Sequence, residues 1–302
     1  MRKTIYLHVG YHKTATTFLQ NSIFPNLKKV RHIKNKKIKK ELYNLRVRKL
    51  SDEDINEIRA KFDRLGKEGK PTLISYEGLS GSPFKQKKPK KHSSILKDLR
   101  RVFPEDQYDV KLIIGIREQV QMMSSLYIQY LHMGGYQKVE DYMEKLERHE
   151  VLDQYKYNEY LNLVEEIFGQ DYYLFIYENL KKDEKNYLLA LLNYIGVNKI
   201  PNYKTDPVNK SYGVLQAKIA RRLNKYFKTK QNPNGKFKVK KSKRFGKLWP
   251  RTFLQNKISY AIHYKRYTLP EDIQESLRER YKEDNIKLSK RDNVNLPSQY
   301  LY

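Results

Sequence analysis

A lysine and three threonines follow a short apolar run near the amino terminus. The apolar run, Ile5 to Val9, is typical of a buried strand, and a helical pattern with Phe18 and Ile23 on one face comes soon after it. A turn between a strand and a helix can hold a phosphate group, because its N–H groups point at the anion and the helix start carries about half a positive charge. We therefore predict an anion-binding loop. Its residues are Gly10, His12, Lys13, Thr14, Ala15, Thr16 and Thr17.

The spacing within this loop differs from that of nucleoside triphosphatases, which place their glycines and lysine as GxxxxGK[ST]. Here the order is GxxKTxTT, without a second glycine before Lys13. The segment HVGYHKTATTFLQ instead resembles the 5′-phosphosulfate loop of sulfotransferases, usually written KTGTT, with Ala15 in the glycine position. This resemblance implies 3′-phosphoadenosine 5′-phosphosulfate (PAPS) as the sulfuryl donor and adenosine 3′,5′-bisphosphate (PAP) as the product. A positive φ at Ala15 would strain the alanine.

A second motif lies about a hundred residues later. The near-continuous apolar run from Val110 to Ile116 is typical of a parallel strand that is covered on both faces. Arg117 follows it directly, and Ser125 comes eight residues after Arg117. The pair resembles the 3′-phosphate site of the same family, in which the arginine would form charged bidentate bonds and the serine would use its hydroxyl. Ser124 is the alternative, although its hydroxyl could bond back to its own helix.

Glu77 is the candidate general base. It falls just past the expected strand Thr72 to Ser75, and many glycan sulfotransferases carry their catalytic glutamate in a similar place. Sulfuryl transfer needs a base for the proton of the attacking hydroxyl and positive charge at the leaving oxygen, which we assign to Glu77 and Lys13. Histidines remain alternatives: some branches of the family use one as the base, which makes His132 a candidate, and His12 could face donor or acceptor. No metal-ligand spacing such as HExxH occurs, so we expect no metal.

Length and composition fit an intracellular enzyme. The chain has 302 residues, no cysteine and a formal net charge of +28. This length can bury one large α/β core. The absence of cysteine excludes disulfides and is consistent with a reducing compartment. No stretch approaches the roughly twenty apolar residues of a membrane span, and the first apolar run is too short for a signal peptide. We expect a bacterial-type cytoplasmic protein.

The basic residues concentrate in three segments. Residues 207–270 hold eighteen Lys and Arg without an Asp or Glu, residues 26–50 hold eleven against Glu41 alone, and residues 85–101 hold eight against Asp98 alone. The rest of the chain is mildly acidic. Such concentrated charge attracts anionic partners. We expect either an anionic acceptor such as an acidic polysaccharide or a peripheral contact with an acidic membrane surface; a composition bias that keeps the protein soluble is the alternative.

Strands and helices alternate along the first two thirds of the chain, which indicates parallel βαβ units. A further buried strand is expected at Tyr172 to Ile176, and the basic segment 26–50 is expected to be helical. Other helices are expected at residues 51–66, 94–102, 158–168, 186–195 and 269–288.

We therefore predict an α/β fold with two parts. Residues 1–206 form the sulfotransferase-like core, a P-loop-type parallel β-sheet flanked by helices that carries the PAPS site. Residues 207–302 form a basic, mainly helical carboxyl-terminal extension of the same domain. Because ligands of such sheets bind beyond the carboxyl ends of the strands, we expect Lys13, Glu77 and Arg117 at one edge.

The carboxyl-terminal region gives three weaker expectations. Lys210 is a candidate for the basic loop that covers the nucleotide in related enzymes. Residues 225–251 are low in apolar residues and predict a basic loop, and residues 297–302 predict a loose end. The aromatic residues that suggest docking of that basic loop are Phe237, Phe245 and Trp249.

Together these features predict a sulfotransferase that moves a sulfuryl group from PAPS to a hydroxyl of a saccharide or polysaccharide. Two alternatives stay open. A nucleotide kinase or hydrolase would need a magnesium-binding carboxylate at a strand end and the GK[ST] spacing. A non-enzymatic protein that binds nucleic acid or another polyanion is suggested by charge alone, and because no recognition motif supports it we expect no specific nucleic-acid partner.

Overall fold

The computed structural model describes residues 2–66, 69–81, 83, 90–203, 211–238, 254, 265–292 and 294–302. Packing divides the chain into two units. The sheet unit comprises Met1–Glu118, His149–Thr205 and Arg280–Tyr302, and the helical unit comprises Gln119–Arg148 and Asp206–Glu279. The expected partition into residues 1–206 and 207–302 stays a prediction.

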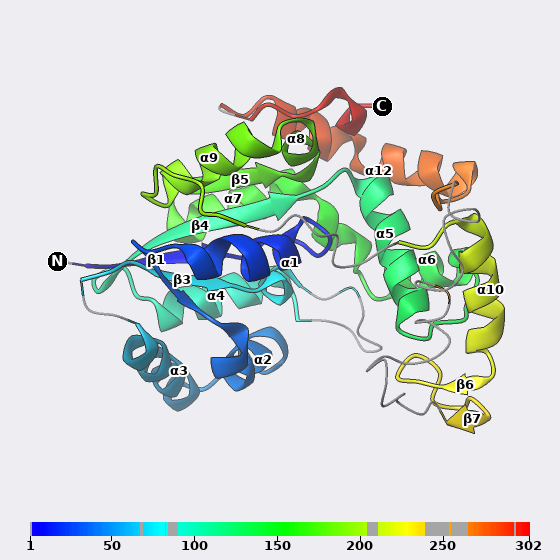
Figure 1. Ribbon diagram of the computed structural model, residues 1–302, viewed down its shortest axis with the longest axis horizontal. Coiled ribbons are helices and arrows are strands. Elements are labelled where there is room, and N and C mark those ends of the chain that lie inside the picture. Colours follow the sequence, from blue (N-terminus) through cyan, green and yellow to red (C-terminus); the bar gives the residue numbers. More distant parts are fainter. Residues whose placement is uncertain are drawn as a thin grey trace. The chain divides into compact units, whose positions relative to one another are not determined.

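The sheet unit is built on five parallel strands (Figure 1). They run in the order β2-β3-β1-β4-β5, and β1 pairs with β3 on one side and β4 on the other, so that Ile5 lies opposite Thr72 and Val110. The strands are β1 (Lys3–His8), β2 (Arg31–Ile33), β3 (Thr72–Ser75), β4 (Tyr108–Ile116) and β5 (Tyr172–Ile176). This sheet confirms the predicted α/β fold with a parallel sheet.

Helices cover both faces of this sheet (Figure 1). One face buries an apolar cluster from four strands against the segment after β1 and against α9, with Ile113, Phe175 and Leu188 at its centre. On the other face α4 and α7 pack against each other. The helices of the unit are α1 (Thr16–Phe18), α2 (Lys39–Val47), α3 (Asp52–Leu65), α4 (His92–Val102), α7 (Tyr157–Phe168), α8 (Tyr177–Lys182) and α9 (Glu184–Tyr194). Shorter helical turns lie at Leu19–Ile23, Phe24–Asn26, Asn35–Lys37, Glu77–Ser80, Leu152–Tyr155 and Ser298–Tyr300.

Local signals account for several of these elements. The start of α3 is fixed by a capping box, in which the Asp54 N–H donates to the Ser51 hydroxyl and the Ser51 N–H donates to the Asp54 carboxylate, each over 3.2 Å. The predicted strand at Tyr172–Ile176 is confirmed, and α7 ends before Gly169, as expected.

Two expectations about the sheet unit were wrong. The basic segment 26–50 is not simply helical, because β2 (Arg31–Ile33) adds an edge strand to the sheet before α2 begins. The end of the chain is not loose either: Tyr300 is buried and its hydroxyl donates to the Glu178 carboxylate over 2.8 Å. A short edge strand has little periodicity of its own, and the Tyr300 contact depends on a residue 122 positions away.

The helical unit contains α5 (Gln119–His132), α6 (Val139–Arg148), α10 (Val214–Asn224) and the short strands β6 (Phe227–Lys228) and β7 (Phe237–Lys238). Stacked and tilted tyrosine rings, Tyr127, Tyr130 and Tyr142, join α5 to α6. The helix α12 (Glu271–Ser289) begins in this unit and ends in the sheet unit. Within the described segments, none of the helices has both the length and the apolar character to span a membrane.

Candidate functional site

The loop after β1 lies directly against the end of β4. A Cβ on Gly10 would come within 2.7 Å of the Gly115 nitrogen, and a Cβ on Gly115 would come within 2.7 Å of the Thr14 hydroxyl oxygen. The Tyr11 N–H donates to the Gly115 carbonyl over 2.8 Å. Two glycines therefore permit this close approach. Gly115 was not among the predicted site residues, although a glycine inside an apolar strand is a known signal of close backbone approach.

The loop backbone contains two left-handed residues. Lys13 and Ala15 both adopt left-handed conformations, with φ of 67° and 62°. Left-handed residues that alternate with right-handed ones turn successive N–H groups toward one concave side, where anions bind. Ala15 thus has the positive φ at which the sequence predicts strain, and for a residue with a Cβ this costs about 1–2 kcal/mol.

The side chains of the loop divide into supporting and accessible groups. The Thr14 hydroxyl is fully buried and donates to the Tyr11 carbonyl over 2.6 Å, so it stabilises the turn. Thr16 is also buried, whereas Thr17 is exposed, and His12 and Lys13 are partly buried. The loop is anchored by the buried ring of Tyr11, which was not among the predicted site residues. That ring packs against three tyrosines with centroids 5.0–5.5 Å away: Tyr155, Tyr157 and Tyr160.

Arg117 follows β4 and meets this loop. Its guanidinium donates to the Lys13 carbonyl over 3.3 Å and lies over the Tyr177 ring at 4.6 Å from the centroid. The Tyr157 hydroxyl donates to the Arg117 carbonyl over 2.6 Å, and the arginine side chain is almost fully buried. The arginine is therefore fixed in place by backbone, ring and hydroxyl contacts together.

Ser125 lies on α5, in the helical unit. Its neighbour Ser124 is buried and donates its hydroxyl back to the Val120 carbonyl over 2.9 Å, whereas Ser125 is partly exposed. That difference favours Ser125 over Ser124 as a ligand. Because Arg117 and Ser125 belong to different units, their joint grip on one phosphate stays a prediction.

Two other predicted residues also belong to the chain outside the sheet unit. His132, the alternative base, is buried on α5 with its ring 4.1 Å from that of Tyr212. Lys210 lies outside the described residues, as do Phe245 and Trp249.

Glu77 begins a helical turn directly after β3. The Gln20 side-chain amide donates to the Glu77 carboxylate over 3.4 Å and to the Ser75 carbonyl over 3.1 Å, so it connects the helical segment after the loop to the strand end. The Tyr76 N–H donates to the His8 carbonyl over 2.9 Å, which continues the pairing of β3 with β1 up to Tyr76, the residue before Glu77. The carboxylate is thus placed beside the loop.

His12 connects the loop with Glu77 electrostatically. Burial lowers the pKa of the His12 imidazole to about 4, Glu77 opposes this change, and the charges of Arg46 and Lys13 favour it. Burial disfavours the charged form of a group. The imidazole is therefore neutral at pH 7, within the electrostatic reach of two cations and one carboxylate.

Three predicted residues end three adjacent strands. Lys13 follows β1, Glu77 follows β3 and Arg117 follows β4, and the sheet places these strands side by side and parallel. The expectation that they share one edge of the sheet is confirmed.

Comparison with known proteins gives matches among solved structures only; no family model and no curated protein matches the sequence. A sulfotransferase from Alicyclobacillus acidocaldarius is 12% identical with a TM-score of 0.48, over 74% of this chain and 94% of that one. The sulfotransferase domain of the curacin biosynthetic pathway is 11% identical with a TM-score of 0.38, over 68% and 76% of the two chains. A retinol dehydratase solved with retinol and PAP is 11% identical with a TM-score of 0.38, over 98% and 84%.

At these identities the likeness concerns the fold alone. Because the identities and TM-scores are low, the chemistry of this chain has to be argued from its own residues.

Proposed function

We propose that the protein is a sulfotransferase that uses PAPS as donor and transfers the sulfuryl group to a hydroxyl of a saccharide acceptor. The observation that carries the proposal is the junction of the Gly10–Thr17 loop with Arg117, next to Glu77 at one sheet edge. A concave backbone with a lysine, a fixed arginine and a nearby carboxylate provides what the reaction needs: anion binding, charge neutralisation and a base.

The donor would supply the activated sulfuryl group, and the protein residues would bind and orient it. The N–H groups of the loop, with Lys13, Thr16 and Thr17, suit the phosphosulfate end. Arg117 and Ser125 suit the 3′-phosphate, and Lys210 is a further candidate for the nucleotide. The fixed position of Arg117 fits such a role, because a guanidinium that is already oriented loses little entropy when it binds phosphate.

Glu77 would take the proton of the acceptor hydroxyl while the hydroxyl oxygen forms the new bond to sulfur. The bond from sulfur to the phosphate oxygen breaks, and PAP leaves. Lys13 stabilises the charge that develops on that oxygen. The neutral imidazole of His12 is the alternative base beside Glu77, and His132 is the second alternative.

Calorimetry tests the donor site without knowledge of the acceptor. We expect PAP to bind the wild-type protein more than about tenfold tighter than adenosine 5′-monophosphate, because the latter lacks the phosphate assigned to Arg117. Transfer of labelled sulfate from PAPS to a panel of polysaccharides and small alcohols then identifies the acceptor. A folded protein that ignores PAP would contradict the proposal, and salt-sensitive DNA binding by that protein would favour the polyanion-binding alternative.

A further inference from the structure

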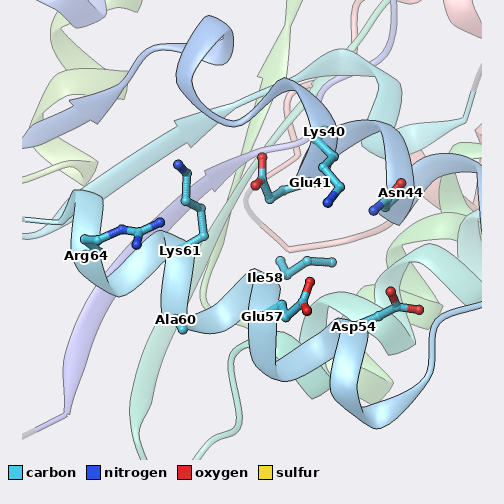
Figure 2. A pocket seen from close by; sticks show the side chains of 9 residues that line it. All are labelled: Lys40, Glu41, Asn44, Asp54, Glu57, Ile58, Ala60, Lys61 and Arg64. Carbon is cyan, nitrogen blue, oxygen red and sulfur yellow. The ribbon is translucent and has the colours of Figure 1, made fainter.

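The two faces of α2 have different surroundings. One face borders a hollow of about 330 Å³ between α2 and α3 (Figure 2). Its charged side chains, three cations and three carboxylates, balance one another. They are Lys40, Lys61, Arg64, Glu41, Asp54 and Glu57. Balanced charges of this kind give a ligand of either sign no net attraction, and we assign the hollow no function.

Arg46 projects from the roughly opposite face of α2, since successive residues of an α-helix are about 100° apart. It lies against the turn that begins with Glu77: a Cβ on Gly78 would come within 3.0 Å of the Arg46 Cδ. The guanidinium lies over the Tyr43 and Tyr76 rings, at 5.9 and 5.8 Å from their centroids. The side chain is therefore held at the Glu77 side of the sheet edge.

The hydrogen-bonding capacity of Arg46 is not used up by its neighbours. Its Nε is buried without a hydrogen-bond partner among the described residues. By contrast Arg48, two positions later, pairs with Asp54 over 3.6 Å, and Arg101 pairs with both Asp52 and Asp98. A buried guanidinium N–H that lacks a partner costs free energy, so the neighbours of Arg46 do not fully satisfy it, while the residue as a whole is only partly buried.

Electrostatics place Arg46 and Glu77 around the same groups. Burial raises the pKa of the Tyr76 phenol; the charge of Arg46 opposes this rise and the charge of Glu77 adds to it. The same two charges also act on the pKa of His12. Tyr43 is 54% exposed, so one of the rings beside Arg46 is open to solvent. The cation thus lies near the carboxylate assigned to the acceptor hydroxyl, beside an accessible aromatic surface.

We propose that Arg46 is a specificity-determining residue that binds the carboxylate of an acidic saccharide, of the uronic acid type, whose neighbouring hydroxyl is presented to Glu77. This inference rests on the proposed function. A guanidinium binds a carboxylate through two parallel N–H bonds, which fixes the orientation of the ligand as well as its affinity. An aromatic ring beside the cation offers an apolar surface to the sugar ring.

The test compares a uronic-acid-containing tetrasaccharide with its carboxyl-reduced neutral counterpart by calorimetry, with and without PAP. We expect the acidic ligand to bind wild-type protein about tenfold tighter or more, and Arg46→Met to abolish that difference. Arg46→Lys should keep part of it. Arg48→Met removes a charge from the same end of α2 and should leave the difference intact.

Three outcomes would overturn the inference. Wild-type protein could bind the two ligands with equal affinity, or it could bind neither measurably. Alternatively, Arg48→Met could abolish the difference in affinity as completely as Arg46→Met does. A purely structural or charge-balancing role of Arg46 would lower the affinity for both ligands alike. Thermal melting shows whether each variant is folded. Arg46→Met should not change the affinity for PAP. PAP binding tests the proposed function separately, because the affinities for the acidic and the neutral ligand can be compared whether or not PAP binds.

Discussion

Arg117 and Arg46 both lie near the carboxyl ends of the central strands, but they are held in different ways. Arg117 is almost fully buried and bonded to the Lys13 carbonyl, with its own carbonyl held by Tyr157. Arg46 is only partly buried, and it is held by two tyrosine rings, one of which, Tyr43, is 54% exposed. A preformed grip suits a ligand that never changes, such as the donor nucleotide, whereas a partly exposed arginine beside an accessible ring suits an acceptor that completes its surroundings.

The largest expected effect separates chemistry from donor binding. Glu77→Gln removes the proposed base but keeps the shape of the side chain, so turnover should fall by about 10²–10⁴-fold while PAP affinity stays the same. Labelled-sulfate transfer and PAP calorimetry measure the two quantities. Glu57→Gln, at an exposed carboxylate on α3, is the matched control. Retained turnover in the Glu77 variant would move the base to His12 or His132.

The next effect tests whether Arg117 belongs to the donor side. Arg117→Ala should weaken PAP binding by roughly ten- to a hundredfold, because charged hydrogen bonds of about 1.5–3 kcal/mol are lost. Arg100→Ala is a close control: Arg100 also bonds a backbone carbonyl, that of Ile167, and lies 4.3 Å from the centroid of the Phe168 ring. Equal PAP affinities in the two variants would show that Arg117 is only structural.

The sequence was sufficient to place three residues at one edge of the sheet and insufficient to single out Arg46, for a physical reason. Apolar runs reveal buried strands. Arg117, Glu77 and Lys13 could be placed because they come one, two and five residues after the end of such a strand. Arg46 belongs to a segment with eleven basic residues, and charge pattern alone does not say which of them turns toward the sheet edge. That depends on the packing of α2 against the Glu77 turn, which is tertiary.

Close backbone approaches and contacts between distant residues could not be predicted from the sequence for a similar reason. The importance of Gly115 follows only from the position of Thr14, a hundred residues earlier. The buried position of Tyr300 follows from Glu178. Conversely, Arg117 and Ser125 are only eight residues apart, yet they belong to different units.

A smaller effect concerns the pH dependence of stability, and it tests the protonation state of His12 in the loop. Because the folded pKa of His12 is lowered to about 4, the unfolded chain binds more protons than the folded protein between that pH and about 6.5. The contribution of His12 to stability is therefore complete above about pH 6.5 and is lost as the pH falls toward 4. His12→Gln should reduce the slope of unfolding free energy against pH in this window by at most about 1.4 kcal/mol per pH unit.

Denaturant unfolding at a series of pH values between 4 and 7 measures that slope. His8 and His92 also have lowered pKa values, about 3 and about 4, so part of the slope should persist in the His12 variant. His92→Gln is the matched control: it should reduce the slope while leaving PAP affinity unchanged, whereas His12→Gln changes the loop itself. An unchanged slope in the His12 variant would contradict the neutral state assigned to this imidazole.

The smallest effect concerns the stability that the left-handed conformation of Ala15 in the loop costs the protein. Ala15 has a φ of 62°, a conformation that glycine adopts freely, so Ala15→Gly should stabilise the protein by about 1 kcal/mol. Ala60→Gly, at an exposed position within α3, should destabilise it by about 0.5–1 kcal/mol, because there the same change only adds backbone freedom. Opposite signs in denaturant unfolding would identify the strain at Ala15. Equal signs would mean that the loop relaxes in solution, and the contrast between a fixed donor side and an adaptable acceptor side would then lose its clearest support.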